Sequence, residues 1–284
     1  MERIKITIDS ACDCDAENIK NNNIAVIPFN VLLGEKEYLD QVNISGNDIV
    51  KFFEEKSILP KTSAPSVVAY KQFFEEALKD SDYVIHFSIS NELSVAHSNA
   101  TIASKDFNGK VEVINSKSLS SGISLVMLYC LDAIKEGKSF KEVCEIAKIL
   151  PNKTQASFVT DDLTMLYKGG RCSGVSFFFG SALHIKPSLL LKSGKIIPNK
   201  KYIGLKFSNV VKKYIADTLK QFPNVNKKRC FVTHTLTDSA IVQLVKEEAS
   251  KIFDEVIESE AGATICSHCG RNTIGLLYVC NEEI

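Results

Sequence analysis

The stretch Ile4-Lys5-Ile6-Thr7-Ile8-Asp9-Ser10 decides the fold class of this chain. Its isoleucines alternate with polar residues, which is the pattern of a β-strand, and the strand ends at Asp9-Ser10. Working outward, three further apolar runs predict strands: residues 24–33, 83–89 and 111–114.

Helical patterns separate these strands. Ser45-Gly46-Asn47-Asp48 has the form of a capping box that starts one helix, and Ser66 is placed to cap the next. Apolar spacing predicts three more helices: residues 93–104, 121–136, and 140 up to Pro151. Strands that alternate with helices over residues 1–150 predict a parallel, doubly wound sheet.

Polar loops follow the expected strands. Ligands of open α/β sheets bind beyond the carboxyl ends of the strands. Three loops lie at such ends: Asp9-Ser10, residues 88–94 and residues 115–121. We therefore expect a binding site at this edge of the sheet.

In the second half of the chain, the expected strands and helices do not alternate regularly. Ser193-Gly194 predicts a hairpin turn between two apolar runs. The expected strands are residues 155–160, 183–191, 195–200, 230–234, 255–259 and 276–280, and the expected helices are residues 163–168, 204–221 and 238–252. We predict an N-terminal α/β domain over residues 1–155 and a C-terminal α+β domain over residues 156–284.

The composition narrows the functional classes. The 284 residues include 34 Lys+Arg and 34 Asp+Glu, so no charge excess calls for nucleic acid or an anionic membrane. The N-terminus has no apolar signal region and no stretch is long enough for a transmembrane segment, so we expect a cytoplasmic protein. Nine cysteines without secretory context are expected to be reduced thiols.

Three segments carry candidate binding chemistry. The tandem hydroxyls of Thr62-Ser63-Ala64-Pro65-Ser66 can donate to a carboxylate, and the loop at residues 88–94 is equally polar. Helix capping explains both segments as well, and is the preferred interpretation of the first. Arg171, after Gly169-Gly170, suits a carboxylate or phosphate, or is a surface residue after a helix end.

A fourth segment, residues 262–270, combines small residues with His268, Cys266 and Cys269. His268 is able to donate to a carboxylate, bind a metal or activate a thiol. Cys12 and Cys14 with Cys266 and Cys269 would make a zinc site, but this spacing is a weak zinc signal. His86 and His184 are expected to be structural, and Phe177-Phe178-Phe179 to belong to the core. His234, at the end of an expected strand, is a weaker site candidate.

Taken in order along the chain, these segments resemble the DegV family of bacterial fatty-acid-binding proteins. The matching segments are Asp9-Ser10, residues 62–66, residues 88–98, Asn115-Ser116-Lys117, residues 166–171, Ile185-Lys186-Pro187 and residues 262–275. The resemblance implies two α/β domains with a buried fatty-acid slot between them, and no metal or cofactor. It also implies a non-catalytic protein.

By matching motif, the resemblance assigns the fatty-acid carboxylate to Thr62, Ser94 and His268, with Arg171 nearby. Additional candidates are Ser63, His97, Cys269 and Arg271. Palmitate, stearate or oleate would be a suitable ligand. Some family members hand the acid to a separate ATP-dependent fatty-acid kinase, which makes an acyl phosphate for phospholipid synthesis.

The chain departs from the usual family pattern at two places. Val95-Ala96-His97 follows Ser94 where the family has glycine and then Thr-Tyr, so we expect a reshaped slot near the carboxylate. Cys269-Gly270-Arg271-Asn272 follows His268 where Thr-Gly-Pro-Gly is usual, so Arg271 is expected to add a charge there. Asn115 also replaces a common aspartate.

Two alternative functions remain open at this point. One is a Cys/His-dependent acyl-transfer or thioesterase enzyme, with Cys269 or Cys266 as nucleophile and His268 as base. The other is a structural or regulatory module without a ligand. The sequence contains no Walker A loop, dinucleotide-binding glycine motif, H-E-x-x-H or G-x-S-x-G, so nothing indicates a self-contained nucleotide-using or hydrolytic enzyme.

Overall fold

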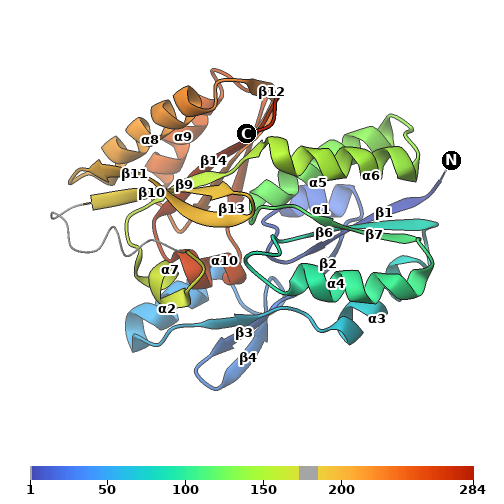
Figure 1. The fold of residues 1–284 in the computed structure, drawn as a ribbon. Helices are drawn as coiled ribbons and strands as arrows, with labels where there is room; N and C mark the ends of the chain where they lie inside the picture. Colours follow the sequence, from blue (N-terminus) through green and yellow to red (C-terminus); the bar gives the residue numbers. More distant parts are fainter. Residues whose placement is uncertain (1, 173–184) are drawn as a thin grey trace.

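The computed structural model describes residues 2–172 and 185–284 (Figure 1). His184 and Phe177-Phe178-Phe179 therefore lie outside the described residues. The first two residues of the strand expected at 183–191 lie outside them as well. No described helix combines the length and apolarity that crossing a bilayer requires.

The first half of the chain forms a four-stranded parallel sheet in the order β2-β1-β6-β7. Its strands are β1 (Ile4–Asp9), β2 (Ala25–Ile27), β6 (Tyr83–Ser88) and β7 (Val111–Asn115). α3 (Val67–Ala77) and α4 (Ala96–Ser104) cover one face, and α5 (Ser121–Lys135) and α6 (Phe140–Ile149) cover the other (Figure 1). The predicted doubly wound arrangement is confirmed.

The expected single strand at residues 24–33 is wrong. Pro28 and Phe29 separate β2 from β3 (Asn30–Leu33), and β3 joins a different sheet. Proline lacks the N–H that a continuing ladder needs, so the chain leaves the parallel sheet there. β3 pairs with β4 (Lys36–Leu39) and β5 (Lys61–Ser63) in a small antiparallel sheet beside α2 (Gly46–Lys56).

The second half builds a seven-stranded mixed sheet in the order β11-β10-β9-β14-β12-β13, with β8 also paired to β14. Its strands are β8 (Thr154–Gln155), β9 (Ser157–Thr160), β10 (Ile185–Lys192), β11 (Lys195–Ile203), β12 (Val225–Thr235), β13 (Glu255–Glu260) and β14 (Thr273–Cys280). α8 (Phe207–Gln221) and α9 (Ser239–Ala249) pack on one face, while α5 packs against β12 and β14.

Several short elements differ from the sequence-based expectation. The helix expected from residue 93 begins only at Ala96, because residues 91–94 turn first. α1 (Ala16–Asn21), β4, β5 and α10 (Ala263–Cys269) were not predicted. α7 (Thr164–Gly169) and two 3₁₀ turns, Lys105–Phe107 and Leu150–Lys153, complete the described elements.

Candidate functional site

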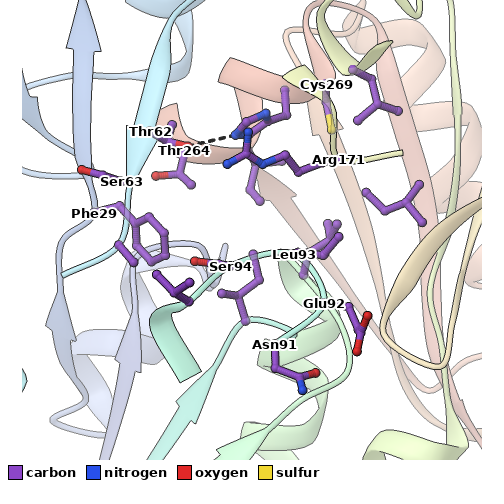
Figure 2. A pocket seen from close by; sticks show the side chains of 18 residues that line it. Phe29, Thr62, Ser63, Asn91, Glu92, Leu93, Ser94, Arg171, Thr264 and Cys269 are labelled. Carbon is purple, nitrogen blue, oxygen red and sulfur yellow. Dashed lines mark hydrogen bonds between the residues drawn. The ribbon is translucent and has the colours of Figure 1, made fainter. Parts of the chain in front are cut away.

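A cavity of about 510 Å³ lies where β5, the loop after β6, α7 and α10 converge (Figure 2). Its volume is within the range of small-molecule sites. The apolar part of its lining comes from residues scattered over the whole chain: Phe29, Ile89, Leu93, Leu119, Leu166, Ile196 and Ile265. Thr62, Arg171, Thr264 and His268 gather at one end, the polar end below, whereas Asn91 and Glu92 lie on the far side of the cavity (Figure 2).

Thr62 and His268 meet at this polar end. Thr62 Oγ1 lies 2.9 Å from His268 Nε2, although 206 residues separate them (Figure 2). β5 holds Thr62 through its pairing with Val31 of β3, and α10 carries His268. Burial first, and then the Arg171 charge, lower the pKa of His268 to about 4. The imidazole is therefore neutral near pH 7.

His268 has hydrogen-bonding capacity to spare. Its buried Nδ1 has no hydrogen-bond partner among residues 2–172 and 185–284. Gly169 allows α7 to approach this ring, because a Cβ there would lie 2.9 Å from Nδ1. Close packing against His268 thus explains the first glycine of the Lys168-Gly169-Gly170-Arg171 motif.

Arg171 also faces the cavity, and Figure 2 shows its side chain reaching toward Thr62 and Thr264. The preceding Gly170 adopts a left-handed φ of 70°, and the guanidinium donates to the Gly169 carbonyl at 2.8 Å. Arg171 lines an adjoining hollow with Glu92 and Lys195 as well, and those two side chains form an ion pair at 3.3 Å. Arg171 therefore connects the polar end of the cavity to a charged hollow beside it.

Ser63 and Ser94 both line the cavity. Ser94 Oγ accepts the N–H of Ala96 at 3.2 Å, a bond that leaves its own hydroxyl proton unused. Val95, where the family pattern differs, is largely exposed and lies in the same lining. The structure thus brings Thr62, Ser94, His268 and Arg171 to one cavity.

A narrow extension of about 30 Å³ shares Leu119, Ile265 and Cys269 with the main cavity. It runs against the C-terminal sheet, where Phe158 and Leu277 are among its walls. Its hydroxyl groups are bonded elsewhere; Thr273 Oγ1, for example, lies 2.9 Å from Thr160 Oγ1. The inner end of the site is therefore apolar.

Two candidate residues lie away from this cavity lining. Arg271 pairs with Glu54 on α2, with Nε 2.9 Å from a carboxylate oxygen, so it does not add its charge to the polar end. His97 lies in the first turn of α4, one turn beyond Ser94, and does not line the cavity. Both were placed by sequence proximity, which does not determine where a side chain points.

Eight of the nine cysteines are buried thiols, and Cys14 is half-buried. Burial raises the pKa of Cys269 to about 12, and that of Cys266 well above its usual value. Cys269 does line the cavity, whereas Cys266 Sγ lies 3.3 Å from the Ala261 carbonyl. Within the described part of the chain, no three His, Cys, Asp or Glu side chains form a group that could hold a metal ion.

Some lining residues were not singled out from the sequence. Phe29 is one example, and Thr264, although within the candidate segment 262–270, was not named individually. Phe29 follows the proline that separates β2 from β3, and Thr264 lies in the unpredicted helix α10. Glu92, by contrast, belongs to the polar loop after β6 that the sequence did indicate.

These features define a class: a two-domain α/β protein with a largely apolar cavity that is polar at one end. The chain belongs to the DegV family, whose model, described as one of uncharacterised proteins, matches residues 3–281. A DegV domain-containing protein of Clostridium acetobutylicum is 28% identical over 281 residues, with 98% of this chain and 99% of the relative covered.

Solved structures agree with this assignment. A DegV family protein from Thermus thermophilus, described by its fatty-acid binding, matches with a TM-score of 0.88 and 28% identity, over 98% of this chain and 99% of that one. A DegV lipid-binding protein from Thermotoga maritima matches with a TM-score of 0.85 and 25% identity, over 99% and 100%. The predicted fold class and family are confirmed.

Proposed function

We propose that this chain binds a long-chain fatty acid such as palmitate, stearate or oleate in the cavity between its two halves. The observation that carries the proposal is the Thr62–His268 hydrogen bond at the polar end of a largely apolar cavity. Thr62, Ser94 and Arg171 would donate to the carboxylate, and His268 would complete the site by orienting the Thr62 hydroxyl. Residues 1–155 and 156–284, taken as two domains, would each supply part of the wall.

The apolar walls account for the affinity. Burying one methylene contributes about 0.8 kcal/mol, so a chain of roughly sixteen carbons binds strongly without any metal. A buried carboxylate needs donors to offset its desolvation. The neutral His268 can donate from Nε2 to Thr62 Oγ1, which leaves the Thr62 proton for the ligand.

The charged hollow beside the cavity suits presentation to a second protein. We propose that the carboxylate, held beside Arg171, is phosphorylated by a separate ATP-dependent fatty-acid kinase in the cytoplasm. The adjoining hollow at Glu92, Arg171 and Lys195 would give the phosphoryl donor access to it. This chain would then be the non-catalytic partner.

The Cys/His enzyme is the weaker alternative on this geometry. A thiol with a pKa of about 12 is protonated at neutral pH, and Cys269 is buried. In the native protein, we expect iodoacetamide to modify the half-buried Cys14 before Cys269. Rapid alkylation of Cys269 would favour the enzyme.

Mass spectrometry of an organic extract of the purified protein tests lipid binding directly. We expect near-stoichiometric fatty acid, or uptake of added palmitate or oleate by protein that carries none. A loaded protein should then yield hydroxylamine-trappable acyl phosphate with ATP and a purified fatty-acid kinase. Absence of both bound and added lipid would refute the binding proposal; bound lipid without acyl phosphate would refute only the kinase step.

A further inference from the structure

The amino end of α10 is capped by side chains from far away in the sequence. Its N-cap residue, Gly262, has no side chain to accept the first N–H groups. Asp13 Oδ1 accepts the Gly262 N–H at 2.8 Å, and Asp40 Oδ1 accepts the Ala263 N–H at 2.8 Å. Carboxylates at a helix amino end complement both the free donors and the helix dipole.

Both carboxylates are buried and accept further hydrogen bonds from other parts of the protein. Asp13 and Asp40 are 2% and 1% exposed. Asp13 also accepts from the Ser120 hydroxyl, and its backbone carbonyl accepts from Ser259 Oγ at 2.7 Å. Asp40 accepts from Ser10 Oγ at 2.9 Å. The caps are therefore part of the N-terminal framework rather than mobile surface groups.

Asp40 connects the two partners of the binding site. Its own N–H donates to the Phe29 carbonyl at 3.0 Å, immediately before β3. β3 pairs with β5 and so places Thr62, while Ala263 begins the helix that places His268. Asp40 is thus bonded both to the segment that leads to Thr62 and to the helix that carries His268.

The fit around this cap is close. A Cβ on Gly262 would lie 3.1 Å from Asp40 Oδ1 and 3.3 Å from Asp13 Oδ1. A Cβ on Gly46 would lie 2.6 Å from Cys266 Sγ, so α2 also confines α10. Burial raises the pKa of Asp13 to about 7, while its hydrogen bonds from Ser120 and Gly262 act in the opposite direction.

We infer that Asp13 and Asp40 are positioning residues: they hold α10 so that His268 meets Thr62 and the ligand carboxylate. The consequence for ligand affinity rests on the proposed function, whereas the placement of His268 can be measured in the ligand-free protein. An oxygen atom that accepts a hydrogen bond is needed at each position. An amide can replace it at Asp13, because its carbonyl can accept from Gly262 while its NH₂ donates to the Ser120 hydroxyl.

The test compares Asp13→Ala, Asp40→Ala and Asp13→Asn by NMR titration of the His268 imidazole and by oleate affinity. In the two alanine variants we expect the His268 pKa to rise from about 4 toward 6.5 as water reaches the ring, and oleate affinity to fall about tenfold or more. Asp13→Asn should keep the low pKa and an affinity within about threefold of the unmodified chain.

Two controls keep the result decisive. Val245→Ala lowers stability in the core under α9, away from the cavity, and should leave the His268 pKa unchanged. Gly262→Ala retains both carboxylates but displaces them slightly, so it should shift the His268 pKa in the same direction as the alanine variants, by a smaller amount, even if those variants do not fold. An unchanged His268 pKa in Gly262→Ala and in every foldable alanine variant would overturn the inference. Failure of the unmodified chain to bind oleate would instead refute the proposed function, and the titration would still decide the positioning role.

Discussion

Helix α10 has a polar cluster at each end, and the two clusters differ in how completely their hydrogen bonds are filled. At the amino end, both oxygens of Asp13 and of Asp40 accept hydrogen bonds from the protein. Toward the carboxyl end, His268 bonds Thr62 but its Nδ1 is unpaired within the described chain. Filled capacity marks the cluster that supports the fold, whereas the hydroxyl protons left free at Thr62 and Ser94 mark the cluster that can receive a carboxylate.

The clusters also differ in the direction of their pKa shifts, which predicts opposite pH dependences. Asp13 has its folded pKa raised to about 7, so its stabilising contribution is complete below pH 4 and is lost as pH rises to 7. His268 has its folded pKa lowered to about 4, so stability is lost as pH falls from 6.5 toward 4. Each effect amounts to about 1.4 kcal/mol per pH unit at most.

Urea denaturation between pH 4 and 7.5 would separate the two contributions. Relative to the unmodified chain, Asp13→Asn should gain stability as pH rises, and His268→Ala should lose it. Parallel curves for both variants would contradict this difference between the clusters.

The next largest effect is expected in ligand affinity. Thr62→Ala and His268→Ala each remove a member of the carboxyl-end cluster and should weaken oleate binding about 10- to 100-fold. Ser94→Ala should weaken it less, because Ser94 Oγ already accepts from Ala96. Isothermal titration calorimetry measures the change, and His234→Ala, a buried histidine outside the cavity, is the matched control. Unchanged affinity in the three site variants would remove the carboxylate site.

A third comparison lies among the aspartates themselves. Asp9 Oδ1 accepts the Ala11 N–H, and Oδ2 accepts the Ile89 N–H and the Ser88 hydroxyl. In Asp9→Asn the amide NH₂ must face one of these backbone donors, at a cost of about 1–3 kcal/mol. Asp13→Asn has no such conflict, so at pH 5 it should be clearly more stable than Asp9→Asn. Equal unfolding midpoints would show that the acceptor geometry is not decisive.

The smallest effect is expected at Arg271, which the family comparison brought near the ligand and the structure places on Glu54. The two side chains are 45% and 52% exposed, and such pairs contribute about 0.5 kcal/mol or less. Arg271→Ala should therefore change neither oleate affinity nor the melting temperature appreciably. A tenfold loss of affinity would place Arg271 at the ligand after all.

Local patterns predicted much of the fold. β1 has the expected ends because its alternation is unbroken, and the Ser45 capping box forms as expected. The prediction of one continuous strand through Pro28 was wrong, because the chain pairs with one sheet before this proline and with another sheet after it. α10 was missed because its seven residues include no capping side chain, and its caps come from residues 13 and 40.

The site was harder to predict from chemistry than the fold. Thr62 and Ser94 each have a plausible local role as a turn or cap residue, and their grouping with His268 came from the family resemblance. The contact that gives Thr62 its role spans 206 residues and leaves no local signal. Asp13 and Asp40 look like ordinary surface acids until their burial is known.

Helix α5 has a consequence for how the chain folds. Eleven of its fifteen residues are buried, because it packs against β1 and β6 of the parallel sheet and against β12 and β14 of the other. A chain cut near residue 155 would leave this helix with one apolar side bare and the second sheet without its cover. We therefore expect the two halves to unfold together as one cooperative unit, and neither half to fold when expressed alone.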